Sequence, residues 1–144
     1  MTVEEATSLT QKLVAALNRR DKDAWIASFD PDMEGHSGLV TAEGGAPFRG
    51  LEGAADWFDN LVDVYESVQA SLEQTIVVGD VALQLLRVEY VGKASGVALA
   101  PLVAWVSRIR DGRYTYVHSH FDVAEGFLDV GRLLAPGGTS PTTP

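Results

Sequence analysis

Three residues near the end of the chain, His118, His120 and Asp122, have the side-chain types and the spacing for proton transfer. Residues two apart in a β-strand point to the same face, so these groups lie side by side if this segment is a strand. Imidazole and carboxylate groups are common general acids and bases in enzymes. The segment therefore predicts an acid–base site, provided that its face is turned toward a pocket.

The residues from Val97 to Val123 predict the β-hairpin that sets this face. Two apolar stretches meet at Asp111-Gly112, which is a strong signal for a two-residue hairpin turn. That turn fixes the cross-strand partners as Arg110 with Arg113, Trp105 with His118, Val103 with His120 and Pro101 with Asp122. One face is then predicted to carry Val103, Trp105, Ser107, Tyr114, Tyr116, His118, His120 and Asp122. Aromatic, imidazole and carboxylate groups on one face are typical of a pocket lining.

A second predicted hairpin turns at Gly79-Asp80 and brings a charged pair onto an apolar face. A two-residue turn there pairs Leu72 with Arg87 and Ala70 with Glu89. Arg87 and Glu89 are then expected among the leucines of residues 81–91. A charged pair in such a place is either a buried ion pair or part of a functional site.

The first half of the chain predicts the helices that cover these strands. A helix is expected over residues 3–19 after a capping box that begins at Thr2, and a shorter one after Asp21. The clearest helical pattern, over residues 51–66, buries Ala54, Trp57, Phe58, Leu61, Val62 and Tyr65. A short strand is predicted over residues 33–40. It carries Glu34 and His36, and the sequence does not determine which face of the sheet their side chains are on. A loop is expected over residues 41–47 and a short helix over 124–134. Helices followed by antiparallel strands indicate the α+β class, with the helices on one face of a curved sheet.

Composition limits the partners. The chain has 144 residues, a net charge of −9 and no cysteine. We expect one domain over residues 1–134 and a flexible tail over 135–144. The negative charge argues against nucleic acid and anionic membranes as partners, and no apolar run is long enough to span a bilayer. The expected partner is an apolar small molecule, the expected location the cytoplasm. An apolar outer sheet face predicts a homodimer; its residues are Leu102, Val106, Val117 and Phe121.

The chain resembles the SnoaL-like polyketide cyclase branch of the nuclear-transport-factor-2-like superfamily. The matching pieces are Phe48-Arg49-Gly50, the turn from Arg110 to Arg113, and His120-Phe121-Asp122 followed by Ala124-Glu125. The resemblance implies a cone, in which a curved antiparallel sheet wraps around three helices and encloses a pocket. The branch includes polyketide cyclases, ketosteroid isomerases, epoxide hydrolases, polyether cyclases and non-catalytic binders, and it generally works without a cofactor.

The residues and the resemblance together support three functional hypotheses. In the first, a cofactor-independent cyclase or isomerase uses Asp122 and His120 for proton transfer, with Arg87 and Glu89 setting the charge of the pocket. The expected substrate contacts are Trp57, Tyr65, Trp105, Tyr116 and His118, with Glu34 and His36 as further candidates. In the second, Arg87 bridges Glu89 and Asp122 to open an epoxide, since Arg87-Val88-Glu89 is similar to a motif of limonene-type epoxide hydrolases. The third is a non-catalytic small-molecule binding protein.

His118 and His120 also have the spacing of metal ligands, and a third ligand is needed for a site. Asp122, Glu89 and His36 are the candidates for it. Because the resembling branch generally works without metal, we assign no metal site from the sequence.

Overall fold

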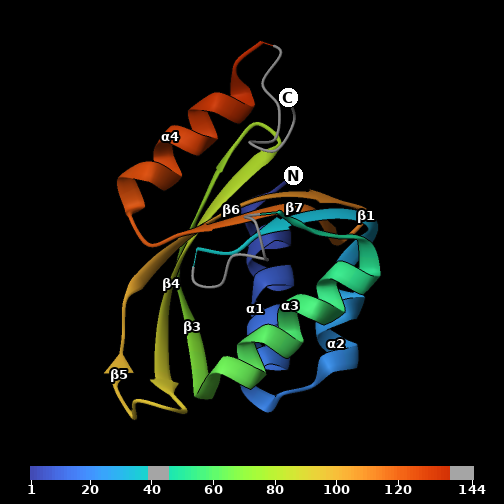
Figure 1. Cartoon of the computed structure of the whole chain (residues 1–144). Helices are drawn as coiled ribbons and strands as arrows, with labels where there is room; N and C mark the ends of the chain where they lie inside the picture. The colour runs from blue at the N-terminus through green and yellow to red at the C-terminus, as the bar shows by residue number, and fades with distance from the viewer. Residues whose placement is uncertain (39–45, 137–144) are drawn as a thin grey trace.

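Figure 1 shows a computed structural model of the chain, in which a curved sheet lies between three helices on one side and a fourth helix on the other. The structure describes residues 1–38 and 46–136. Its elements are α1 (Val3–Arg19), α2 (Lys22–Ala27), β1 (Phe29–His36), β2 (Phe48–Arg49), α3 (Gly50–Val64), β3 (Tyr65–Val78), β4 (Val81–Gly92), β5 (Ala98–Leu99), β6 (Leu102–Arg110), β7 (Arg113–His120) and α4 (Val123–Leu134). Most of the predicted 41–47 loop, the end of the predicted 33–40 strand and the tail from residue 137 lie outside the described residues.

The seven strands of the described residues form one sheet in the order β2-β1-β7-β6-β4-β3, with β5 paired to β4. The predicted α+β class and curved sheet are confirmed. β1 runs parallel to β7, and this pair departs from the predicted antiparallel sheet. The hairpins turn at the predicted dipeptides: Gly79, Asp111 and Gly112 have φ of 62°, 53° and 73°, in the left-handed region that tight hairpin turns use.

The three helices α1, α2 and α3 begin close to their predicted positions. The Thr2 side chain caps α1 by accepting from the backbone N–H of Glu5 at 3.1 Å. The Asp21 side chain caps α2 by accepting from the N–H of Ala24, also at 3.1 Å. We call the sheet face toward these helices the inner face. Large buried side chains fill the space between helices and sheet, among them Trp25, Phe29, Met33, Trp57 and Leu86.

A chain of buried hydrogen bonds ties α1 to the middle of the sheet. The hydroxyls of Thr10 and Tyr114 lie 2.6 Å apart, and the Gln84 amide donates to the Thr10 hydroxyl at 2.9 Å. Ser107 in turn donates to the Gln84 carbonyl oxygen at 3.1 Å. Because these buried polar groups satisfy one another, they fix α1 in one position on the sheet.

The fourth helix, α4, packs on the opposite, outer face of the sheet (Figure 1). Gly126 permits this approach, since a Cβ at that position would lie 2.6 Å from the Cβ of Ala104. The predicted outer apolar face is partly wrong: Val106 is buried beneath α4, and Val117 belongs to the inner core. Pairing of two copies through this side of the molecule stays a prediction.

Candidate functional site

Two β-bulges determine which side chains face the inside of the cone. One extra residue in a strand reverses the facing of every residue beyond it relative to the partner strand. One bulge places Thr115 as the extra residue of β7, and the other places Glu73 as the extra residue of β3. Both lie between the tight turns and the residues predicted to form the site.

The bulge at Thr115 changes the register of β6 and β7. The strands leave their turn as predicted, but beyond the bulge Trp105 pairs with Ser119 instead of His118. The prediction that His118 and His120 share a face with Trp105 is therefore wrong. Three predicted site residues lie on the outer face as a result: Tyr116, His118 and His120.

The bulge at Glu73 has the same effect on β3 and β4. Beyond it, Leu72 pairs with Leu86 instead of Arg87. Arg87 and Glu89 are consequently exposed on the outer face. Arg87 and Glu89 share a face with Leu83 and Leu85, as predicted, but this is the outer face, whereas Ala70 and Leu72 turn inward beyond the bulge. The prediction that the charged pair points toward the covering helices is therefore wrong.

The three charged residues proposed to open an epoxide do not meet. Arg87 forms an ion pair with Glu73 at 3.8 Å and donates to a backbone carbonyl at 3.0 Å. Asp122 is exposed and caps α4, where its side chain accepts from the backbone N–H of Ala124 at 2.9 Å. An aspartate at a helix N-terminus is satisfied by the free N–H groups there. Within the described residues, Asp122 therefore neither faces the cone nor bonds to Arg87 or Glu89.

Inside the cone, the helices and the inner sheet face enclose a cavity with an almost wholly apolar wall. Its residues include Leu17, Trp57, Leu86, Val88, Tyr90 and Trp105. The space is about 500 Å³ with its opening to solvent, but only about 30 Å³ of it is free for water, which is room for one or two molecules. A larger ligand must therefore move the lining side chains apart.

Two of the predicted substrate contacts line this cavity. Trp57 and Trp105 lie in its wall with their rings stacked, the centroids 5.9 Å apart. Tyr65 is not in the wall; its ring packs on Tyr90 at a centroid distance of 4.9 Å. Sequence patterns did not indicate Ser119, which reaches the wall because the β7 bulge turns it inward.

The indole nitrogen of Trp105 is a buried donor without a hydrogen-bond partner among the described residues. By contrast, Trp25 in the same wall donates its indole N–H to the carbonyl of Ala54 at 2.9 Å. A buried donor left unpaired costs about 1–3 kcal/mol. Trp105 therefore offers an unused hydrogen bond inside an apolar surrounding.

The described part of the cavity wall contains no Asp, Glu, His, Lys or Arg. Tyr90 is its ionisable group, and burial raises the pKa of that phenol, with the nearby Tyr65 adding to the rise. A phenol with a raised pKa stays neutral at physiological pH. The described wall therefore offers no charged group for proton transfer.

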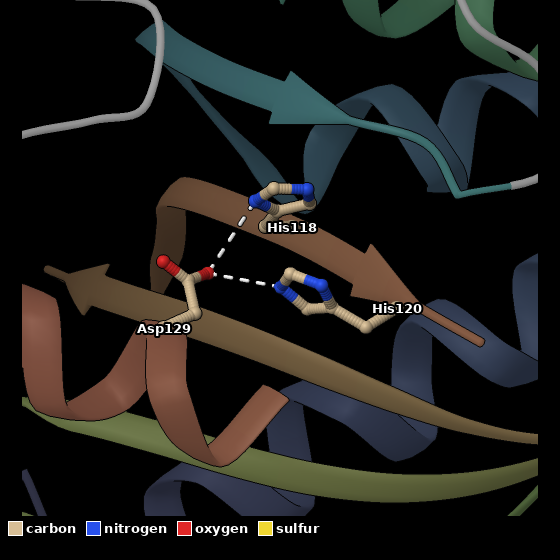
Figure 2. Close-up of side chains that lie close together, drawn as sticks. All are labelled: His118, His120 and Asp129. Carbon is tan, nitrogen blue, oxygen red and sulfur yellow. Dashed lines mark hydrogen bonds and ion pairs between the residues drawn. The ribbon is translucent and has the colours of Figure 1, made fainter. Parts of the chain in front are cut away.

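On the outer face, His118, His120 and Asp129 meet between β7 and α4 (Figure 2). Oδ2 of Asp129 lies 3.1 Å from Nε2 of His120 and 3.4 Å from Nδ1 of His118. The Tyr116 hydroxyl donates to the same oxygen at 3.2 Å, and Arg132 donates to Oδ1. These five residues are called the outer cluster below.

Electrostatics in the outer cluster favour an ionised carboxylate. Burial alone would raise the pKa of Asp129, but hydrogen bonds from His118, His120 and Arg132 hold it well below its usual range. Burial and the charge of Asp129 both raise the pKa of the Tyr116 phenol, which stays protonated as a donor. The cluster therefore presents a buried anion to two imidazoles.

Glu34 and His36, whose facing the sequence left open, lie on the outer face beside the outer cluster. Nε2 of His36 is 2.8 Å from Glu34, and Arg49 pairs with the other Glu34 oxygen at 2.9 Å. The His36 ring lies 4.8 Å from the ring of His118 between centroids. Burial lowers the pKa of His36 although the bond to Glu34 opposes this. Neither residue belongs to the described wall of the cone cavity.

Asp129 is a candidate functional residue that the sequence patterns did not reveal. It lies on the buried side of α4, with Gly126, Val130 and Leu133. A carboxylate within the apolar stripe of a helix requires buried hydrogen-bond or ion-pair partners. The position of Asp129 in that stripe is the sequence signal that could have identified it. The partners themselves could not be identified, because the predicted register placed both histidines on the opposite face.

A curved sheet around three helices, with an apolar cavity between them, defines the nuclear-transport-factor-2-like class of folds. A protein of unknown function with this fold from Burkholderia pseudomallei is 19% identical, with a TM-score of 0.72 over 87% of this chain and 95% of that one. IdmH, a proposed polyketide cyclase from Streptomyces antibioticus, is 20% identical, with a TM-score of 0.67 over 87% and 97% of the two chains. A Mycobacterium tuberculosis protein in complex with estradiol-17β-hemisuccinate is 17% identical, with a TM-score of 0.69 over 83% and 95%. At these identities the likeness establishes the fold.

Residues 10–117 match the family model of the SnoaL-like domain, so the chain belongs to the SnoaL-like family. No curated protein sequence matches the chain. None of the helices within residues 1–38 and 46–136 is both long and apolar enough to cross a membrane.

Proposed function

We propose that the chain binds a largely apolar small molecule with one hydrogen-bond acceptor inside the cone. The unpaired indole N–H of Trp105, in the wall of the apolar cavity, carries this proposal. A ligand carbonyl or hydroxyl placed against that N–H recovers a buried hydrogen bond, while the rest of the ligand replaces contacts between apolar side chains. The steroid ester bound by the Mycobacterium tuberculosis neighbour also has a large apolar body, although it carries several polar groups.

A pair of ligands that differ in the acceptor tests the proposal. We suggest 1-tetralone, a bicyclic ketone, and tetralin, its parent hydrocarbon, with dissociation constants measured by isothermal titration. The wild type is expected to prefer the ketone by about 2- to 13-fold, since a net hydrogen bond contributes about 0.5–1.5 kcal/mol. Trp105→Phe removes the donor and should abolish the preference.

Trp57→Phe is the matched control, because it shrinks the same wall and leaves the Trp105 N–H in place. It should change the affinity for both ligands to a similar extent and keep the preference for the ketone. A preference that persists in Trp105→Phe, or no binding of either ligand to the wild type, contradicts the proposal.

A cofactor-independent cyclase or isomerase acting on a polyketide-like molecule is the second candidate function. Membership of the SnoaL-like family and the Trp105 donor favour it. An N–H held against a carbonyl stabilises the oxyanion that develops when the carbonyl enolises, with the α-proton passing to a water in the cavity and returning to the alkoxide formed when the carbons join. Confinement of a flexible chain brings its reacting carbons together. In this form the hypothesis assigns the central role to Trp105 instead of Asp122 or His120.

Product analysis separates the two candidates. A linear polyketone incubated with the protein should be recovered unchanged if the cone only binds it, and a cyclised isomer of equal mass should form if the cone is catalytic. For a catalytic cone, Trp105→Phe should lower kcat, whereas Asp122→Asn should not, because that side chain is exposed at the end of α4. Loss of turnover in Asp122→Asn alone would return the aspartate to the mechanism.

A further inference from the structure

We propose that His118, His120 and Asp129 bind a divalent transition-metal ion on the outer face of the sheet (Figure 2). Each residue offers one ligand atom, and these three atoms all lie within 4.8 Å of one another. The site lies on the opposite face of the sheet from the cone cavity, so the inference does not depend on the proposed ligand-binding function.

The donor set suits a first-row transition metal. Two imidazole nitrogens with one carboxylate oxygen form three-ligand centres that leave further coordination positions open, as in hydrolytic zinc sites and mononuclear iron(II) sites. Hard cations such as Mg²⁺ and Ca²⁺ prefer sets made of oxygen alone. Zn²⁺ and its spectroscopic substitute Co²⁺ are therefore the appropriate probes.

Two of the three distances between ligand atoms in the cluster are close to those that a bound ion requires, and the third is within 4.8 Å. Ligand atoms at about 2.0–2.2 Å from a metal in tetrahedral geometry lie about 3.4 Å from one another. The Asp129 oxygen already lies 3.1 Å from the His120 nitrogen and 3.4 Å from the His118 nitrogen. Rotation of the two imidazoles about their side-chain bonds then brings all three atoms around one point.

The carboxylate is held in place by groups that would remain outside the metal shell. Arg132 binds Oδ1 of Asp129, and the Tyr116 hydroxyl donates to Oδ2. Such outer partners orient a ligating carboxylate and tune its affinity for the ion. Arg132 leaves Oδ2 directed at the imidazoles, and one oxygen is all that a monodentate ligand needs.

Rigid elements position the three donors. His118 and His120 are two apart in β7, so they project from the same face of one strand. Asp129 lies on the buried side of α4, and because Gly126 has no side chain, that helix can pack closely against β6. An ion there joins the helix to the strand and stabilises the packing of α4.

The cluster is open to solvent on one side. His118, His120 and Asp129 line a surface cleft together with Glu125 and Leu128. The side chains of His118 and His120 are 22% and 13% exposed, while that of Asp129 is 4% exposed. An ion can therefore enter from the cleft and hold water at its free positions, and the carboxylate of Glu125 partly offsets the positive charge of Arg132.

Cobalt titration tests the proposal on the full chain, purified without a polyhistidine tag and dialysed against EDTA. The wild type should bind one Co²⁺ per chain with a saturable visible absorption band, which Zn²⁺ then displaces, and its melting temperature should rise with Zn²⁺. His118→Ala, His120→Ala and Asp129→Asn should each lower the affinity by at least about 10- to 100-fold, the range seen even for partners outside the metal shell.

His36→Ala provides the matched control, since His36 is the third histidine of the chain and lies on the same face. It should keep the cobalt band and the melting shift. Circular dichroism confirms the fold of each variant, and His120→Gln replaces Asp129→Asn if the latter does not fold. The proposal is overturned if the wild type shows no saturable cobalt band, or if the three ligand variants bind as tightly as the control.

Discussion

The close packing of α4 on the sheet depends on the absence of a side chain at Gly126. A second glycine in the same helix, Gly131, allows a matched test. A Cβ at Gly126 would lie 2.6 Å from the Cβ of Ala104 and 3.6 Å from a methyl group of Leu83. A Cβ at Gly131, in the same helix, would meet nothing within 4 Å. Substitution by alanine therefore changes helix propensity equally at the two positions but changes packing at only one.

The two expected effects differ in sign. Alanine in place of a helical glycine contributes up to about 1 kcal/mol, so Gly131→Ala should raise the free energy of unfolding by that amount. Two carbon atoms need about 3.5–4.0 Å, so Gly126→Ala forces α4 about 1 Å away from β6. Overpacking of this kind costs about 1–3 kcal/mol, which leaves a net loss of about 0–2 kcal/mol after the gain in propensity.

Urea unfolding followed by circular dichroism measures both values. The reasoning is refuted if Gly126→Ala stabilises the protein as much as Gly131→Ala does. In that case α4 would not be held by the close approach that the structure shows, and the position of Asp129 beside the histidines would lose its structural basis.

Three further outcomes are expected. Gln84→Leu should lower the free energy of unfolding by about 1–3 kcal/mol, because it removes the acceptor of the buried Ser107 hydroxyl and the bond to Thr10; an unchanged urea midpoint would show that these bonds add no stability. Gly35→Ala should weaken 1-tetralone binding, since its Cβ would lie 2.5 Å from the Trp57 ring and push that ring toward the cavity; equal affinity in titration calorimetry would speak against a ligand in the cone. Hydrogen bonds from the Asp32 backbone and from Arg110 lower the pKa of Asp30 in the folded protein. The ionised Asp30 carboxylate therefore stabilises the fold at pH values above its unfolded pKa of about 4, and this stabilisation is lost as the pH falls below that value. The wild type should accordingly lose stability more steeply than Asp30→Asn in urea unfolding below pH 4, and parallel curves would contradict this.

Much of the fold could be predicted from the sequence because its signals are local. Thr2 and Asp21 cap the helices they were expected to cap, and Ala54, Trp57, Phe58 and Leu61 of the predicted α3 stripe are buried. The stripe ends earlier than predicted, since Tyr65 already belongs to β3. The turn at Asp111-Gly112 has the predicted left-handed backbone. Capping, helical periodicity and turn geometry each depend on a few neighbouring residues, so a single sequence contains them.

The sheet face to which the candidate site residues point could not be predicted, because it depends on two single-residue bulges. A bulge leaves the composition of a strand unchanged, and neither Thr115 nor Glu73 has a side chain that marks one. The bulge at Thr115 reversed the sheet face predicted for His118 and His120. The bulge at Glu73 turned Ala70 and Leu72 inward, away from Arg87 and Glu89, which stay on the outer face with Leu83 and Leu85. The assignment of Trp105 to the cavity was correct.

The central claim is that a ligand enters the cone and meets the indole N–H of Trp105. Proton–nitrogen correlation spectra test it directly, with the Trp105 indole signal assigned by its absence from Trp105→Phe. Saturating 1-tetralone should move that signal downfield, and should move the indole signal of Trp25 less, because its N–H is already bonded to Ala54. The account is contradicted if the Trp105 signal stays in place while the ring signals of His118 and His120 shift, because the ligand would then bind at the outer cluster.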